Sequence, residues 1–364
     1  MDKGITKDQS KMLQGIAILM MLYHHIFSTP EALGIDYSSL LNINGINIEL
    51  HMAWFFKICV GIYAFVSGYG LCRSLRTLTN KKKLNNVSLP NNYMFKMRMI
   101  LGKLLSFYYD YWLVFFVFVP IGFIFFNKQF DIKEFLLNLI GFSSSYNGAW
   151  WYVLQYLKML IVLPFIDLLF TRFESKRYRI QWLFYVVLCV LFILLFRFLY
   201  PIEFGRFIEF FQPAFFLCFI IGYLISRFDI IEFLYKYLPN MLLSILGIIG
   251  LILVIVVRVK IAKDASSAGL DFIFVPVFLF GVIILMNYFT KISKVLLFFG
   301  KYSTYIWLVH VFFYDHYAKK LVMISKQSTI IYLTLLLLST ISAILLAGLK
   351  KYIQIGLFHL QKKD

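Results

Sequence analysis

Residues 241–257 read MLLSILGIIGLILVIVV, and no charged side chain interrupts the run. An α-helix needs about 20 apolar residues to cross the roughly 30 Å hydrocarbon core of a membrane, because each residue adds about 1.5 Å. The pattern predicts an all-α, polytopic transmembrane helical bundle of about ten spans, built by residues 1–364 as a single membrane-embedded domain. The other apolar runs fall at about residues 12–28, 52–71, 99–126, 149–170, 182–199, 208–226, 270–288, 303–318 and 329–348.

The composition excludes a soluble globular protein. Hydrophobic residues make up 61% of the 364 residues and charged residues only 15%, against about 45–50% and about 25% in soluble domains. The net charge of +18 would suggest nucleic acid binding in a soluble protein, but in a membrane protein it reports topology. Basic residues gather in alternate connections, most heavily in residues 73–103, which predicts that both termini are cytoplasmic. We expect contact with membrane lipids and no nucleic acid partner.

The spans leave no room for a soluble catalytic domain, so any chemistry must use residues on the spans or on their short connections. The four cysteines, Cys59, Cys72, Cys189 and Cys218, lie in or beside apolar runs without a paired or metal-binding spacing. This pattern predicts buried thiols, with no disulfide framework and no metal site.

The first span, LQGIAILMMLYHHIF at residues 13–27, carries polar groups at two depths. Gln14 and His25 are eleven residues apart, so both point the same way and lie roughly 16 Å apart along the helix axis. A neutral imidazole such as that of His25 is the commonest general base for a hydroxyl. The alternative is a histidine that is hydrogen-bonded for helix packing. His24 points about 100° away and cannot act from the same place as His25.

Two further polar motifs fall within spans. The second span ends in FVSGYG, residues 65–70. Its Ser67 and Tyr69 could line a channel, whereas its glycines are also typical of close helix packing. His310 lies about seven residues into the ninth span, with aromatic neighbours that could simply anchor the helix at the interface.

Aromatic and basic residues mark the two ends of the spans. Trp150 and Trp151 open the fourth span, where they could anchor the helix or stack against a sugar. Arg98 and Lys103 open the third span, where they could reach the lipid headgroups or clamp a polyanionic cytosolic ligand.

Three charged residues, Asp110, Lys158 and Asp167, lie inside or near spans. Unpaired charges are costly in the bilayer, so we expect each of them to pair with a polar partner. The segment of residues 134–147 is amphipathic and then serine-rich, which indicates a stretch lying along the outer interface.

Four segments occur in this order: LQGIAILMMLYHHIF (13–27), FVSGYG (65–70), AWWYVLQYLKMLIVLP (149–164) and FGKYSTYIWLVH (299–310). In order and spacing they resemble the acyltransferase-3 family of bacterial membrane proteins. The resemblance implies transfer of an acyl group, usually acetyl, from cytosolic acetyl-CoA or another acyl-CoA to a hydroxyl of a glycan or glycolipid, in the bacterial cytoplasmic membrane.

The resemblance can be followed at individual residues. The family has an arginine eleven positions before its first-span histidine; here His25 is kept and Gln14 replaces the arginine. The family's basic pair after the second span, implicated in holding the CoA, is matched only loosely by Arg98 and Lys103. Ser67, Tyr69, Trp150, Trp151 and His310 also match positions of the family's motifs. For the reaction we expect His25 as the base, with His24 and Tyr69 as further catalytic residues. We expect Gln14, Arg98, Lys103, Ser67 and His310 on the donor side and Trp150 and Trp151 on the acceptor side.

Two other functions fit the same residues. A transporter or flippase of a lipid-linked saccharide would also need intramembrane polar groups and basic loops, and it would transfer no acyl group. A component of a polysaccharide assembly complex would depend on partner proteins for its activity.

Overall fold

The computed structural model describes residues 4–31, 34, 37–84, 90–172, 212–261 and 269–361. The chain forms two compact units, each assembled from three separate stretches of sequence. Unit 1 contains Met1–Leu13, Ile58–Gly102 and Gln155–Ser293, and unit 2 contains Gln14–Lys57, Lys103–Leu154 and Lys294–Asp364.

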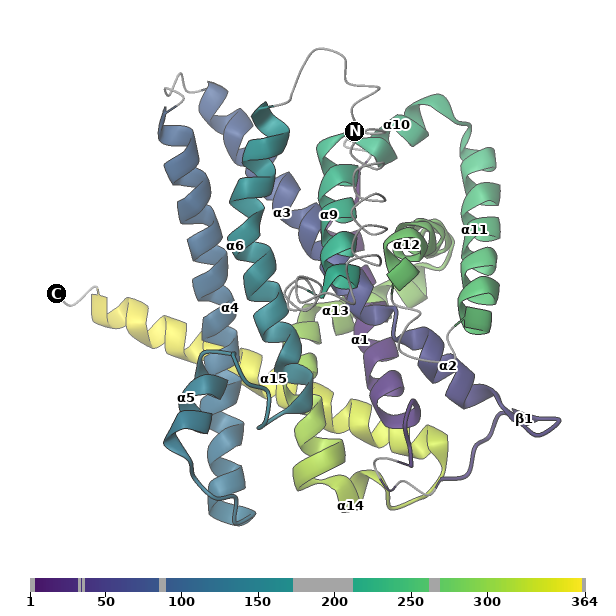
Figure 1. Cartoon of the computed structure of the whole chain (residues 1–364), viewed down its shortest axis with the longest axis vertical. Helices are drawn as coiled ribbons and strands as arrows, with labels where there is room; N and C mark the ends of the chain where they lie inside the picture. Colours follow the sequence, from purple (N-terminus) through teal and green to yellow (C-terminus); the bar gives the residue numbers. More distant parts are fainter. Residues whose placement is uncertain are drawn as a thin grey trace, which may run out of the picture. The chain divides into compact units, whose positions relative to one another are not determined.

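Unit 1 is built on helices that pack side by side (Figure 1). Helix α3 (Cys59–Leu84) packs along α9 (Pro213–Arg227), α9 packs on α12 (Asp271–Tyr288), and α12 packs on α11 (Asn240–Ile261). The short α10 (Ile230–Tyr237) follows α9 after a bend of 52°. The first residues of α4 (Pro90–Phe125) and most of α6 (Trp151–Arg172) also belong to this unit.

Glycines bring α3 and α9 into backbone contact. A Cβ atom on Gly68 would collide with the carbonyl oxygen of Phe219, and one on Gly222 would collide with that of Phe65. Small residues allow this close approach between helices in a membrane, where dispersion contacts replace the hydrophobic effect as the driving force. The glycine of the FVSGYG motif at position 68 therefore has a packing role.

Unit 2 contains most of α1 (Lys7–Phe27), which packs against α13 (Thr290–Val311) so closely that a Cβ on Gly15 would collide with the carbonyl of Leu296. The connection after α1 holds an antiparallel hairpin in which Asn42 faces Asn47 and Ile43 faces Ile46. The remaining elements are β1 (Asn42–Ile43), β2 (Ile46–Asn47), α2 (Ile48–Phe56), the rest of α4, α5 (Ile132–Leu139), η1 (Gly148–Trp150), η3 (Phe312–Tyr317), α14 (Lys319–Val322) and α15 (Ser328–Gln361).

Seven helices among the described residues are long and apolar enough to cross a membrane, or up to eight if the bent pair α9 and α10 forms one span. This confirms the all-α, multi-pass prediction, whereas the number of spans and the side of the termini stay predictions. The expected span at 182–199 lies outside the described residues, and α1 is helical but is not among the seven. The seven are Ile48–Thr77, Met94–Phe125, Gly148–Leu168, Asn240–Ile261, Asp271–Tyr288, Thr290–Tyr317 and Ser328–Gly356.

Two of the three intramembrane charges have partners that the structure identifies. In unit 2, Asp110 accepts hydrogen bonds from the Lys350 ammonium at 2.6 Å and from the hydroxyl of Tyr305. In unit 1, Asp167 accepts from Lys96 at 2.6 Å and from the Tyr223 hydroxyl, also at 2.6 Å. The expectation of polar partners is therefore confirmed for both aspartates, and Lys158 lies buried on α6.

The cysteines that the structure describes are buried free thiols: Cys59, Cys72 and Cys218. Cys189 lies outside the described residues. The prediction of buried thiols is confirmed for these three side chains.

Candidate active site

His25 lies in the last turn of α1 with polar side chains of unit 2 on one edge of its ring. Its Nδ1 is 3.4 Å from Nε2 of His310 and 3.3 Å from the hydroxyl oxygen of Tyr314. His25 itself is half-buried, whereas His310 and Tyr314 are buried. The histidine that the sequence favours as a base thus joins a polar cluster, and it is the least buried member of the cluster.

The two partners of His25 come from one continuous stretch of chain. Helix α13 ends at Val311 and passes directly into the π-helical turn η3, so His310 and Tyr314 are one turn apart and face the same way. Single π-helical turns are rare and occur frequently at functional sites. The widened turn holds both side chains against the same nitrogen of His25.

His310 is fixed by a backbone contact on its far side. Its Nδ1 lies 2.6 Å from the carbonyl oxygen of Trp307 in the preceding turn of α13, and the ring is fully buried. Its ring centroid lies 4.9 Å from that of His25 at an interplanar angle of 71°. The imidazole of His310 therefore stands between a backbone carbonyl and His25.

His24 has a different environment from its neighbour in the sequence. Its Nδ1 donates to the carbonyl of Ala53 on α2 at 2.8 Å, which ties the end of α1 to α2. In the neutral ring this places the only proton on Nδ1, so Nε2 of His24 can accept a hydrogen bond but cannot donate one.

Trp150 supports the helix that carries His310. Its ring is buried against Tyr111 and Phe312, and its indole nitrogen donates to the carbonyl of Leu308 at 3.0 Å. This position does not favour sugar stacking by Trp150, while the adjacent Trp151 is half-buried on α6. Acceptor binding by either tryptophan stays a prediction.

Other predicted residues are spread over both units. Gln14 is half-buried and shares the unbroken helix α1 with His25. In unit 1, Ser67 is half-buried and Tyr69 is buried, with its hydroxyl accepting from the backbone N–H of Ile5 at 2.9 Å. Their proposed roles in binding or catalysis stay predictions.

Arg98 and Lys103 are exposed on α4, five residues apart. Neither forms an ion pair with the residues that the structure describes, in contrast to the neighbouring Lys96, which is paired with Asp167. Arg98 and Lys103 alone therefore do not form a preorganised anion-binding site.

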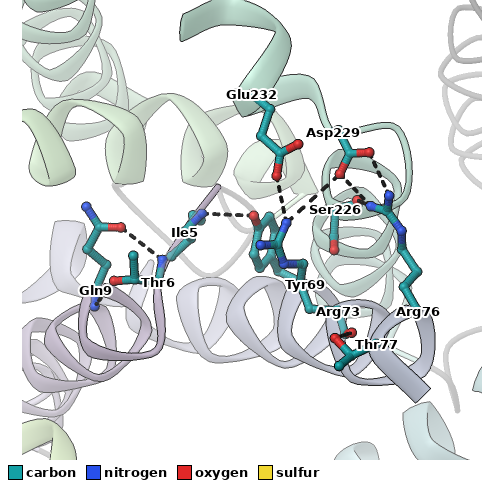
Figure 2. A network of polar contacts seen from close by, with 10 residues as sticks. All are labelled: Ile5, Thr6, Gln9, Tyr69, Arg73, Arg76, Thr77, Ser226, Asp229 and Glu232. Carbon is teal, nitrogen blue, oxygen red and sulfur yellow. Dashed lines mark hydrogen bonds and ion pairs between the residues drawn. The ribbon is translucent and has the colours of Figure 1, made fainter. Parts of the chain in front are cut away.

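Unit 1 contains an arginine cluster that is not among the predicted site residues; Figure 2 shows it from close by. Arg73 donates to Glu232 at 2.8 Å, and Arg76 donates to Asp229 at 2.7 Å and to the carbonyl of Ser226 at 2.6 Å. The arginines lie on α3, whereas Ser226 lies on α9 and both carboxylates follow it at α10 and the bend before it (Figure 2). The cluster thus ties the second half of α3 to the bend.

The signal for this pair was present in the sequence. Arg73 and Arg76 are three residues apart, so they share one helix face, and they follow FVSGYG directly. They fit a basic pair after the second span better than Arg98 and Lys103 do. The donor-side role of Arg98 and Lys103 stays a prediction.

Comparison with known proteins decides the family. The acyltransferase-3 family model, described as an acyltransferase domain, matches residues 9–349. The chain belongs to this family. The match includes both the histidine cluster and the arginine cluster of this acyltransferase. No match is found among curated proteins or among solved structures.

Proposed function

We propose that this membrane acyltransferase moves an acyl group, most simply acetyl, from cytosolic acyl-CoA to a hydroxyl of a cell-surface or lipid-linked carbohydrate, in the bacterial cytoplasmic membrane. The single observation that carries the proposal is the contact of the half-buried His25 with His310 and Tyr314, in a chain that belongs to an acyltransferase family. An imidazole with one ring nitrogen held by polar groups can use its other nitrogen to remove a proton from an alcohol.

His25 acts as the general base in this reaction. It takes the proton of the acceptor hydroxyl while the oxygen forms a bond to the thioester carbonyl carbon. The carbon–sulfur bond then breaks, and the protonated His25 returns the proton to the leaving thiolate. The products are a carbohydrate ester and free CoA thiol, and positioning of the two substrates supplies a large part of the rate.

The negative charge that develops on the carbonyl oxygen needs a hydrogen-bond donor. Neutral His24 is a poor candidate because its one N–H already donates to Ala53. The hydroxyl of Tyr69 accepts from Ile5 and keeps its own proton available, so Tyr69 remains a proposed donor.

The donor also carries phosphates, which require cations. We assign them first to Arg73 and Arg76, because two guanidinium groups on one helix face can bind phosphate oxygens in pairs. In the structure their charge is balanced by Asp229 and Glu232, so a phosphate would have to replace these carboxylates. The exposed Arg98 and Lys103 make a weaker, more solvated contribution.

Purified full-length protein incubated with radiolabelled acetyl-CoA and candidate glycans or glycolipids tests the proposal. We expect a labelled sugar ester whose formation requires the protein. Movement of a lipid-linked saccharide across a vesicle membrane without a labelled ester would contradict the proposal. Ester formation only after addition of polysaccharide assembly proteins would contradict an autonomous enzyme.

A further inference from the structure

The arrangement of nitrogen atoms around His25 raises the question of which ring nitrogen carries its proton. A general base must present an unprotonated nitrogen to the substrate. Among the residues that the structure describes, His310 and Tyr314 both contact Nδ1 of His25, so the nitrogen left for a substrate is Nε2. The proposed chemistry therefore needs the proton on Nδ1 and the lone pair on Nε2.

The backbone decides the state of His310. A carbonyl oxygen can only accept a hydrogen bond, so the 2.6 Å contact with Trp307 requires the proton of a neutral His310 ring to be on Nδ1. Nε2 of His310 then carries a lone pair, and this lone pair faces Nδ1 of His25 at 3.4 Å. The contact is favourable only if Nδ1 of His25 is protonated and donates.

Tyr314 alone would permit the opposite state. Its hydroxyl is 3.3 Å from the same Nδ1 and can either donate to it or accept from it. If Tyr314 donated, the proton of His25 would move to Nε2 and the base would be lost. It would also leave two lone pairs facing each other between His25 and His310.

We infer that His310 is a positioning residue that holds His25 in the Nδ1-protonated form and so keeps its Nε2 available as the base. This inference rests on the proposed function of His25. Once His25 has taken up the substrate proton, His310 accepts a charge-assisted hydrogen bond from it and stabilises the imidazolium. The carboxylate of hydrolase triads stabilises the protonated histidine in the same way. No atom of His310 contacts the substrate in this role.

Without His310, no acceptor requires a proton on Nδ1 of His25, so the direction of its hydrogen bond with Tyr314 can reverse. In His310→Leu, the Tyr314 hydroxyl is free to donate to Nδ1, and we expect the rate of acyl transfer to fall about 100-fold or more, as for other losses of a working base. In the double variant His310→Leu with Tyr314→Phe, nothing forces the proton onto Nε2. We expect the double variant to be faster than His310→Leu alone, by about 10-fold.

His310→Gln is the conservative variant. Its amide oxygen can accept from His25 near the position of the lost Nε2, so we expect it to retain far more activity than His310→Leu. His316→Leu, which removes an exposed histidine six residues further along the chain, controls for general effects of losing an imidazole. A purely structural role for His310 predicts instead that the double variant is no faster than the single one, and this result would overturn the inference.

A measurement without catalysis separates this inference from the proposed function. Nitrogen-15 NMR of histidine-labelled protein in detergent, with His25 assigned by comparison with His25→Gln, reports which ring nitrogen is protonated. We expect Nδ1 in the wild type and in His310→Gln, and Nε2 in His310→Leu. A wild-type His25 with its proton on Nε2 would refute the positioning role. A wild type with the expected protonation but without acyl transfer would refute the proposed function alone.

Discussion

At the scale of single residues, the surroundings of a histidine distinguish a structural role from a chemical one. His24 and His25 are adjacent in the sequence, yet one ring donates to the backbone of Ala53 and the other meets the side chains of His310 and Tyr314. A ring bound to a carbonyl has its proton fixed for packing. A ring bound to other titratable groups can exchange a proton with a substrate without losing a structural bond.

The two sets of cations should differ in their effect on donor binding. Replacing both Arg73 and Arg76 by Gln should raise KM for acetyl-CoA by about 10-fold or more, because hydrogen bonds between charged groups contribute roughly 1.5–3 kcal/mol. Arg98→Gln with Lys103→Gln should raise it less, because exposed charges are screened. Initial rates at varied acetyl-CoA and acceptor concentrations measure both effects.

A control is needed because loss of the arginines leaves carboxylates unpaired. Asp229→Asn with Glu232→Gln removes the same ion pairs but keeps both cations, so KM for acetyl-CoA should fall or stay constant. A larger increase from the Arg98 and Lys103 variants than from the arginine pair would reverse the assignment.

At the scale of helices, glycine spacing sets how closely α3 and α9 pack. Gly68→Ala should destabilise the protein by about 1–3 kcal/mol, because the new methyl group meets the carbonyl of Phe219 and the backbones must separate. Gly70→Ala is the matched control, since Gly70 lies on the same helix and, apart from its chain neighbours and the nearby backbone of that helix, no atom lies within 4 Å of its Cβ position. It should be neutral or stabilising by up to about 1 kcal/mol. Thermal midpoints in detergent compare the two, and equal midpoints would contradict the packing role.

In unit 2, the ion pair between Asp110 on α4 and Lys350 on α15 joins two helices. Asp110→Asn leaves the Lys350 ammonium without its counter-charge in a site where its side chain is only 24% exposed. We expect a loss of about 1–3 kcal/mol. Combining Asp110→Leu with Lys350→Met removes both charges and should restore part of this stability. A double variant less stable than Asp110→Asn would show that the pair itself is strongly stabilising.

The sequence predicted helices well where one run of apolar residues forms one helix. The run at 241–257 lies within α11, and the run at 270–288 corresponds closely to α12. The start of the ninth predicted span was wrong: the span was expected at 303–318, but the helix α13 begins thirteen residues earlier, at Thr290. Lysines in the first turns of α13 made that part resemble a connection, although a helix continues through charged residues without difficulty.

The candidate site was predictable only in part. The position of His25 follows from helix periodicity, because it depends on residues close in sequence. Its contact with His310 joins residues 285 positions apart, and no local pattern encodes such a pairing. For the arginine pair, the spacing of about one helix turn can be read from the sequence. Its partners Asp229 and Glu232 are distant in the sequence and cannot.

At the scale of the whole molecule, the distribution of basic residues predicts the orientation in the membrane. With both termini in the cytoplasm, the hairpin formed by β1 and β2 lies outside, where Ile43 is 56% exposed. Ile43→Cys, in a variant lacking the native cysteines, should react with a membrane-impermeant maleimide in intact cells. A fluorescent protein fused to the carboxyl terminus should be fluorescent in the cytoplasm. If the introduced cysteine reacted with the maleimide only after the cells were lysed, the hairpin would lie in the cytoplasm and the predicted orientation would be wrong.

The most direct test concerns the base itself. His25→Gln should reduce single-turnover transfer of labelled acetyl from acetyl-CoA to the acceptor by about 100-fold or more, with unchanged protein abundance and unchanged binding of acetyl-CoA. Transfer at close to the wild-type rate by this variant would show that another group removes the proton, and the mechanism built on His25 would be wrong.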